Sequence, residues 1–280
     1  MENDFDYIDG EKFENLADVS FGDAHTEAKD IKIQDSIASI DGCPLVFCGT
    51  DRIGEFFDKL NGCDKVFDLI SHNGDRNFSI EDLKRKPKNI RRWYSQNMMC
   101  SNEKVFPLPI GLERVFWSKK FYGSVGYKNK CIYGHKDVEF KKNKLLYVNF
   151  SIRPNRKKRQ RSFDLFRGKG YATVDMGAAN RDYNKYIRSI KESKFVLSPE
   201  GHGLDCHRTW EVLYSGSIPV LEKNSYYASL YSDLPVLMVG DFAEITEKFL
   251  QEKHESIVSS KWNMEKLKFS YWEDIIKKDR

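Results

Sequence analysis

Short apolar runs alternate with amphipathic segments along much of the chain. Residues 45–48 and 65–70 are largely apolar, and residues 53–60 between them repeat apolar positions at the spacing of a helix. Short apolar runs predict buried strands, whereas the helical spacing between them predicts an amphipathic helix. A strand, a helix and a second strand in this order are typical of a βαβ unit with parallel strands.

The alternation becomes more regular after residue 144. Strands are expected in "LLYVNFS", "YATVDM", "KFVLSPE", "SIPVLE" and "PVLMVG", and helices in "RKKRQRSFDLF", "RDYNKYIRSIKES" and "CHRTWEVLYSG". This order predicts a parallel, doubly wound sheet, in which ligands bind at the carboxyl ends of the strands.

The chain therefore predicts an α/β protein with two Rossmann-like lobes. A length of 280 residues is sufficient for two separate cores. The first lobe is expected over residues 1–140, with a peripheral arm over residues 1–40, and the second over residues 141–255. Residues 256–280 carry aromatic anchors and are expected to form a segment that packs back on the first lobe.

Composition narrows the class of protein. Hydrophobic residues make up 40% of the chain and charges of both signs are interspersed, which indicates a folded protein. A net charge of +4 is too small to indicate a nucleic-acid or membrane partner. We expect a cytoplasmic protein, because the N-terminus does not resemble a signal peptide and no apolar run reaches the length of a membrane span. The spacing of the cysteines argues against a structural zinc site and a disulfide framework, so we expect reduced thiols.

Polar groups gather in "SPEGHGLDCHRTWE", between an expected strand and an expected helix. Gly201 and Gly203 let the backbone approach a ligand closely, and Asp205 fits the N-cap of the helix. Free amides at a helix N-terminus bind anions. A capping Asp205 would compete with an anion for these amides, so side chains must contribute to binding.

Three polar side chains of the expected helix, His207, Arg208 and Glu211, fall within one arc of a helical wheel. Arg208 offers planar donors to a pyrophosphate, and His207 can donate to the same group. Glu211 is spaced to accept from ribose hydroxyls, as a carboxylate does in dinucleotide sites. The set predicts a nucleoside-diphosphate site, although Arg208 and Glu211 could instead pair on a solvated face and His207 could be an interior histidine.

These residues also resemble a known family. "FVLSPEGHGLDCHRTWEVLYSGSIPVL", followed by "LYSDLPVLMVGDFAEIT", resembles the carboxyl-terminal signature of exostosin-like glycosyltransferases, including short forms from large DNA viruses of algae such as the chlorovirus xylosyltransferases. The resemblance is specific over residues 145–250. Through "SHNGD", "WYSQNM" and "KVFPLPIGLE" it extends to residues 45–250.

The resemblance implies a GT-B architecture, in which two Rossmann-like lobes face each other across a cleft. It implies an inverting glycosyltransferase that moves xylose from UDP-xylose to a hydroxyl of a glycan or glycoprotein acceptor, without a metal or another cofactor. The pair of carboxylates that most resembles a metal-binding motif, Asp4 and Asp6, lies in the expected arm. The donor would bind the second lobe and the acceptor mainly the first.

The resemblance also carries over residue roles. His207 and Arg208 correspond to pyrophosphate ligands and Glu211 to the ribose ligand, whereas Arg153 would stabilise the charge that develops on the leaving diphosphate. The remainder of the basic segment, residues 156–161, is expected to be a solvated helix. The full expected donor site consists of Arg153, Ser198, Gly201, Gly203, His207, Arg208 and Glu211.

Inverting transfer needs a base that deprotonates the acceptor hydroxyl. The segment "SHNGD" follows an expected strand and offers Asp75 as the first candidate and His72 as the second. Asp51 and Glu113 are further candidates, and each of these carboxylates could instead cap a turn.

Acceptor-binding residues are expected on the first lobe. Asn97, Trp93 and Glu113 are the candidates, with Tyr94 beside them, because aromatic faces suit sugar rings.

Two other functions remain open. The cluster "RPNRKKRQRS" over residues 153–162 would suit a nucleic-acid binder, although no RNP or zinc motif accompanies it. A module that binds a nucleotide sugar without catalysis would carry the same donor residues.

Overall fold

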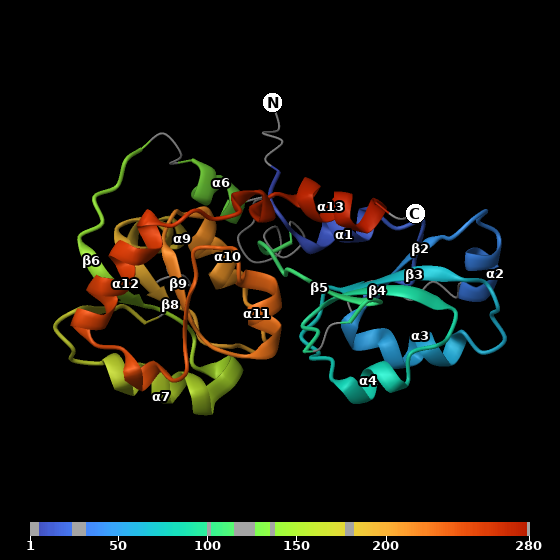
Figure 1. The fold of residues 1–280 in the computed structure, drawn as a ribbon, viewed down its shortest axis with the longest axis horizontal. Helices are drawn as coiled ribbons and strands as arrows, with labels where there is room; N and C mark the ends of the chain where they lie inside the picture. Colours follow the sequence, from blue (N-terminus) through green and yellow to red (C-terminus); the bar gives the residue numbers. More distant parts are fainter. Residues whose placement is uncertain are drawn as a thin grey trace. The chain divides into compact units, whose positions relative to one another are not determined.

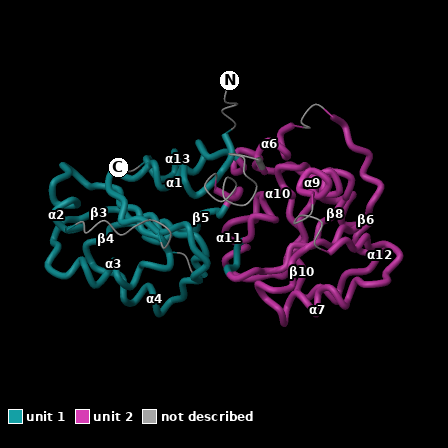
Figure 2. Tube along the Cα trace, turned by 180° about the vertical axis from the view of Figure 1, so that it is seen from behind, with its two compact units in different colours: residues 1–110, 203–205, 268–280 teal, residues 111–202, 206–267 magenta. Residues whose placement is uncertain are grey.

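The computed structural model describes residues 6–23, 32–99, 102–114, 127–134, 138–176 and 182–278. The chain forms two compact units (Figure 2). Unit 1 comprises residues 1–110, 203–205 and 268–280, and unit 2 comprises residues 111–202 and 206–267. Each contains a five-stranded parallel sheet, so the expected α/β class with two parallel sheets is confirmed.

The sheet of unit 1 has its strands in the order of the sequence. The strands are β1 (Val19–Ser20), β2 (Leu45–Gly49), β3 (Phe67–His72), β4 (Ile90–Gln96) and β5 (Val105–Leu108). Two helices after β1 and β2, α2 (Ile33–Ala38) and α3 (Ile53–Lys59), share one hydrophobic core with them. Because the strand order follows the sequence, the order does not reverse anywhere in this sheet. Right-handed crossovers that all step in one direction place their helices on one face of the sheet.

The opposite face of that sheet is covered from both ends of the chain. Figure 1 shows α1 (Gly10–Asn15) and α13 (Phe269–Lys277) on one side and α3 and α4 (Ile80–Lys84) on the other. The Phe13 and Phe269 rings pack edge to face at 5.2 Å. Asp6 accepts from the Ser270 amide at 3.0 Å, whereas Asp4 lies outside the described residues.

The N-terminal segment is therefore not a peripheral arm over its described part. Ile8 and Phe13 are fully buried, and β1 pairs with β2 at the edge of the sheet. Isolated apolar residues on short elements suffice to anchor this segment, which is why its sequence shows little periodicity.

The sheet of unit 2 is doubly wound. Its order is β10-β9-β8-β6-β7, so the chain moves outward from β6 to β7 and then returns to the other side of β6. The strands are β6 (Lys144–Val148), β7 (Ala172–Val174), β8 (Ser193–Leu197), β9 (Ile218–Glu222) and β10 (Leu237–Val239). The helices are α6 (Tyr127–Tyr133), α7 (Arg156–Phe166), α9 (Tyr183–Lys191), α10 (His207–Tyr214), α11 (Ser225–Tyr231) and α12 (Glu247–Ser259). The short 3₁₀ helices of the chain are η1 (Thr50–Arg52), η2 (Arg153–Asn155), η3 (Phe242–Glu244) and η4 (Met264–Leu267).

The unit boundaries differ from the predicted lobes. Residues 111–134 belong to unit 2, because α6 packs against α9 and Lys191 Nζ donates to the Ile132 carbonyl at 2.8 Å. Residues 256–267 also stay in unit 2, and only residues from 268 onward belong to unit 1. Within the described part of the chain, no helix has the length and apolarity that a membrane span requires.

Candidate functional site

The strand order of unit 2 reverses between β6 and β8. These neighbouring strands connect to β7 on one side and β9 on the other. In a doubly wound sheet, the crevice outside the carboxyl ends of such a strand pair is where ligands bind. The loops that begin there are residues 149–155, after β6, and residues 198–206, after β8.

Arg159 of α7 holds both loops. Its Nη1 donates to the Ser151 carbonyl at 2.7 Å, its Nη2 to Pro199 at 3.2 Å and its Nε to Glu200 at 2.8 Å. The side chain is 5% exposed, and burial, together with the neighbouring Arg208, lowers its pKa. The expectation that residues 156–161 are all solvated is therefore wrong for Arg159, which sequence reasoning missed.

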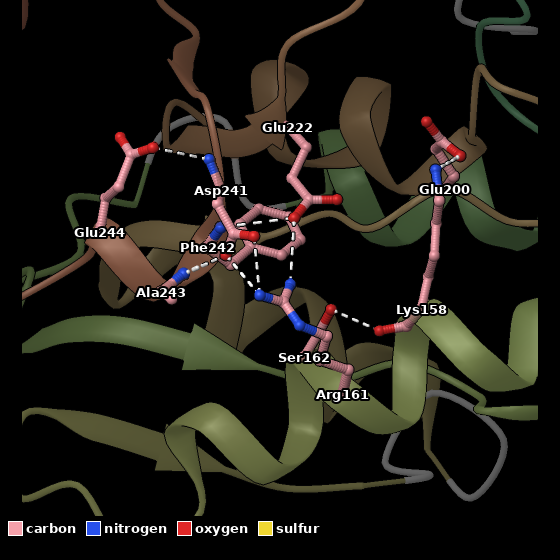
Figure 3. Close-up of polar contacts among 9 residues, drawn as sticks. All are labelled: Lys158, Arg161, Ser162, Glu200, Glu222, Asp241, Phe242, Ala243 and Glu244. Carbon is pink, nitrogen blue, oxygen red and sulfur yellow. Dashed lines mark hydrogen bonds and ion pairs between the residues drawn. The ribbon is translucent and has the colours of Figure 1, made fainter.

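Other basic residues of α7 are paired on the surface of unit 2 (Figure 3). Arg161 Nη2 donates to both carboxylate oxygens of Asp241, at 2.8 and 2.7 Å, and Nη1 lies 3.6 Å from Glu222. Lys158 pairs with Glu200. These pairs neutralise much of the basic cluster, which disfavours a nucleic-acid interface on this helix.

The first turn of α10 has no side-chain cap. The N-cap residue is Cys206, and the expectation of a capping Asp205 is wrong. The Asp205 carboxylate instead accepts from the Ile110 amide of unit 1 at 2.8 Å.

The segment Gly203–Asp205 belongs to unit 1. Asn97 Oδ1 accepts from the Asp205 amide at 2.8 Å, and Asn77 Oδ1 accepts from the Leu204 amide at 3.1 Å. An added Cβ at Gly203 would lie 2.5 Å from Asn97 Nδ2, so a glycine is needed for this packing. Asn97 is buried in this role, whereas the sequence placed it in an acceptor groove.

Two residues of the loop after β8 were expected in the donor site. Gly201 lies next to the Arg159 guanidinium, and Ser198 lies at the carboxyl end of β8. An added Cβ at Gly201 would lie 3.0 Å from Arg159 Nη2 and 3.3 Å from Cys206 Sγ. Ser198, directly after β8, has a buried Oγ without a hydrogen-bond partner among the residues that the structure describes. Such an atom is rarely left unpaired in a native structure, so this hydroxyl is a group that a ligand or a water molecule can satisfy.

Arg208 brings a second guanidinium to unit 2. It lies over the Phe150 ring at 5.9 Å, and its Nε is buried without a hydrogen-bond partner among the described residues. Burial works against its charge, but Tyr186 and Glu211 raise the pKa of Arg208, so the side chain remains a cation. Neither Arg208 nor Arg159 forms an ion pair with a carboxylate in the described part of the chain.

Glu211 lies in the interior of unit 2, whereas the helical wheel predicted that it faces a crevice. Its Oε1 accepts from the Tyr183 hydroxyl and its Oε2 from the Tyr186 hydroxyl, each at 2.9 Å. Burial alone would raise the pKa of this carboxyl. Lys128, Arg208 and the hydrogen bond from the Tyr183 hydroxyl lower the pKa by more than burial raises it, so the net shift is downward. Glu211 therefore acts as a buried anion beside Arg208, and its contact with a ribose is not supported by this geometry.

Glu113 and His207 join the same part of unit 2. Glu113 pairs with Lys128 at 3.2 Å, and Lys128 Nζ lies 3.9 Å from Glu211 Oε1, so Glu113 is not on the first unit as expected. His207 Nδ1 donates to the Gly111 carbonyl at 2.8 Å, because a carbonyl can only accept. With Nδ1 engaged in this way, Nε2 is the ring nitrogen that can face a ligand.

The two candidate bases of unit 1 differ in exposure. Asp75 is exposed on the loop after β3. His72 is 1% exposed, with Nδ1 at 3.0 Å from Asn73 Oδ1 and Nε2 at 3.0 Å from the Pro109 carbonyl. Both ring nitrogens are engaged in the interior, so His72 is placed as a structural residue and not as a base.

The aromatic residues expected to line an acceptor groove lie in the core of unit 1. Trp93 is fully buried and donates from Nε1 to Ser71 Oγ at 2.8 Å, and Tyr94 is also buried. Both belong to β4, whose residues face two covered sides of the sheet. The expectation that Trp93 lines a groove is therefore wrong. It arose because a buried, aromatic-rich strand and an aromatic-lined groove have the same sequence pattern.

The last expected donor residue, Arg153, is exposed on η2, within the loop that follows β6. Among the described residues, no three His, Cys, Asp or Glu side chains gather as a metal ion would require. Within its described residues, unit 2 therefore has a switch point with two buried guanidinium groups that form no ion pair with a carboxylate, a helix that its N-cap residue does not cap, and a buried serine hydroxyl without a hydrogen-bond partner. This is the class of site that binds an anionic ligand at the edge of an α/β sheet.

One family model matches part of the chain. Residues 172–263, about a third of the chain, match the family described as the RXYLT1 C-terminal domain. No curated protein matches the chain at a significant level.

Solved structures similar to the chain include an alpha1,3-fucosyltransferase, with a TM-score of 0.47 and 14% identity over 86% of this chain and 80% of that chain. A UDP-forming alpha,alpha-trehalose-phosphate synthase from Burkholderia vietnamiensis has a TM-score of 0.45 and 12% identity over 88% of this chain and 76% of that chain. Likeness at this level carries no argument about function, and the α/β assignment depends on the strand pairing of the two sheets.

Proposed function

We propose that the protein is a glycosyltransferase that binds the diphosphate of a nucleotide-sugar donor at the switch point of unit 2. The observation that carries this proposal is the pair of guanidinium groups, Arg159 and Arg208, that have no carboxylate partner in the described residues. Glu211 offsets part of the Arg208 charge but also lies beside Lys128, so the two guanidinium groups together still favour an anionic ligand at this site.

The remaining features of the site fit the same ligand. The amides at the start of α10, which the N-cap residue Cys206 does not cap, offer donors, and Ser198 Oγ offers one more. Arg208 Nε is a buried donor that a phosphate oxygen can satisfy. The match of residues 172–263 to the RXYLT1 C-terminal domain supports sugar transfer as the reaction.

The finer proposal is inverting transfer from UDP-xylose to a glycan or glycoprotein hydroxyl. The acceptor oxygen would bond to the anomeric carbon as the bond between that carbon and the diphosphate oxygen breaks. Asp75, which is exposed, would take the acceptor proton, and UDP would leave with the bonding electrons. Arg208 and the amides of α10 would stabilise the charge that develops on the diphosphate, which would remove the need for a metal ion.

The proposal is tested by incubating the purified protein with UDP-xylose, UDP-glucose and GDP-fucose and measuring sugar transfer and donor hydrolysis by mass spectrometry. We expect turnover of UDP-xylose that persists in EDTA. Arg208→Ala should reduce transfer and hydrolysis together, whereas Asp75→Asn should reduce transfer and leave donor binding unchanged. Binding of UDP with no turnover of any donor would favour the module without catalysis.

A further inference from the structure

The loop after β6 begins with two buried residues, Asn149 and Phe150. The Phe150 side chain is 1% exposed and belongs to the hydrophobic core of unit 2. Its place just after β6 puts the ring at the switch point, although the ring offers no hydrogen-bonding group to a ligand. Core packing requires an apolar side chain at this position but does not require an aromatic one.

Two guanidinium groups share the Phe150 ring. The guanidinium carbon of Arg159 lies over the ring at 5.9 Å from its centroid, and the guanidinium carbon of Arg208 lies over the same ring, also at 5.9 Å. A guanidinium within about 6 Å of the centroid is attracted by the negative face of an aromatic ring, and the attraction is stronger where water is excluded. The buried Phe150 ring therefore interacts favourably with both charges.

The same two guanidinium groups repel each other. Burial and the charge of Arg208 lower the pKa of Arg159, so the two groups are electrostatically coupled. Arg159 is fixed by hydrogen bonds to three backbone carbonyls. Arg208 has a buried Nε without a hydrogen-bond partner among the described residues, although Tyr186 and Glu211 favour its charge. Arg208 is thus the less firmly held of the two, and repulsion from Arg159 acts to displace it.

We propose that Phe150 is a positioning residue that holds the Arg208 guanidinium at the switch point against the like charge of Arg159. The inference rests on the proposed function, because the anion that Arg208 would meet there is the diphosphate of the donor. A guanidinium can contact a ring through its apolar face and keep its in-plane N–H groups available to phosphate oxygens. Phe150 would contribute to donor binding in this way without touching the donor.

The test changes the charge distribution of the ring and keeps its shape. The residue introduced in place of Phe150 is 3,4,5-trifluorophenylalanine, because the fluorine atoms withdraw electron density from the ring face and remove most of its attraction for a cation. The same replacement at Phe166 is the matched control. Phe166 is also 1% exposed and lies in the same core, and no cation lies over its ring among the described residues.

Isothermal titration measures the affinity of the three proteins for UDP and for uridine. We expect UDP to bind about fivefold more weakly after the replacement at Phe150, and within about twofold of wild type after the replacement at Phe166. The affinity for uridine, which carries no phosphate, should not change. Equal UDP affinities in the three proteins, or an equal loss at both positions, overturn the inference and leave the donor site intact.

Urea unfolding separates this result from a failure of the proposed function. The replacement at Phe150 is made in wild type and in Arg208→Ala, and the fall in the urea midpoint is compared. We expect a larger fall in wild type, because only there does the ring lose its contact with the Arg208 charge. If UDP binds none of the proteins and this difference is present, Phe150 holds Arg208 and the proposed donor is wrong. If the difference is absent, Phe150 does not hold Arg208 and the inference is overturned.

Discussion

Arg159 holds the two loops of the switch point together, so replacing it should loosen unit 2. Arg159→Met keeps much of the aliphatic volume and removes the guanidinium, which leaves the carbonyls of Ser151, Pro199 and Glu200 without their donor. Arg156→Met, on the exposed face of the same helix, is the matched control.

The size of the effect follows from these three hydrogen bonds. A hydrogen bond to a charged group contributes about 1.5–3 kcal/mol, and the sum for three overstates the loss because removing a buried cation recovers desolvation free energy. We expect Arg159→Met to lower the free energy of unfolding by about 2–4 kcal/mol, which corresponds to a fall in melting temperature of roughly 5–15 °C. Arg156→Met should stay within about 0.5 kcal/mol of wild type.

Urea unfolding followed by circular dichroism measures these values, and the UDP-induced melting shift measures the consequence for the donor site. Arg159→Lys should recover part of the stability, because an ammonium reaches fewer of the three carbonyls than a guanidinium does. Equal unfolding free energies for Arg159→Met and Arg156→Met would refute the argument that this side chain holds the loops.

Three further results are expected. Gly203→Ala should lower the free energy of unfolding by about 1–3 kcal/mol, because its Cβ would lie 2.5 Å from an amide nitrogen, whereas Gly54→Ala, with open space around it, should not; equal stabilities would contradict the packing. Burial lowers the pKa of Lys142 from 10.5 to about 8. The unfolded chain therefore binds this proton more tightly, and the free energy of unfolding should rise between pH 8 and 10.5. Urea unfolding of Lys142→Met should show a smaller rise than wild type, and an equal rise would contradict the lowered pKa of Lys142. Tyr183→Phe removes a donor to Glu211 and should destabilise the protein by about 1–3 kcal/mol in the same assay, and an unchanged value would contradict the buried network.

Much of the fold could be predicted from short-range patterns. Apolar runs located β2 and β3 of unit 1 and the five strands of unit 2, because strands that helices cover on both faces are apolar on both faces, whereas β1 and β4 were not predicted. The strand order could not be predicted, since the same alternation of elements is compatible with the sequential sheet of unit 1 and with the reversing sheet of unit 2. The placement of α13 on unit 1 depends on contacts between chain ends, which periodicity does not report.

The site was predicted in part. The segment of residues 198–211 does lie at the switch point, since a loop after a parallel strand must emerge at the carboxyl edge of the sheet. Arg159 was missed because a buried arginine in a basic helix has the same local sequence as an exposed one. Glu211 and Trp93 were predicted on open surfaces but are buried. The helical wheel and the aromatic pattern predict the direction of a side chain, whereas tertiary packing decides which directions are covered.

The central claim is that the switch point of unit 2 binds a nucleoside diphosphate through Arg208. Isothermal titration of UDP, and of uridine as the uncharged control, into wild type and Arg208→Ala tests it most directly. The account predicts that UDP binds wild type, that uridine binds much more weakly, and that Arg208→Ala loses at least tenfold in affinity, which is about 1.4 kcal/mol. UDP that fails to bind wild type, or that binds Arg208→Ala equally well while that variant stays folded, would contradict it.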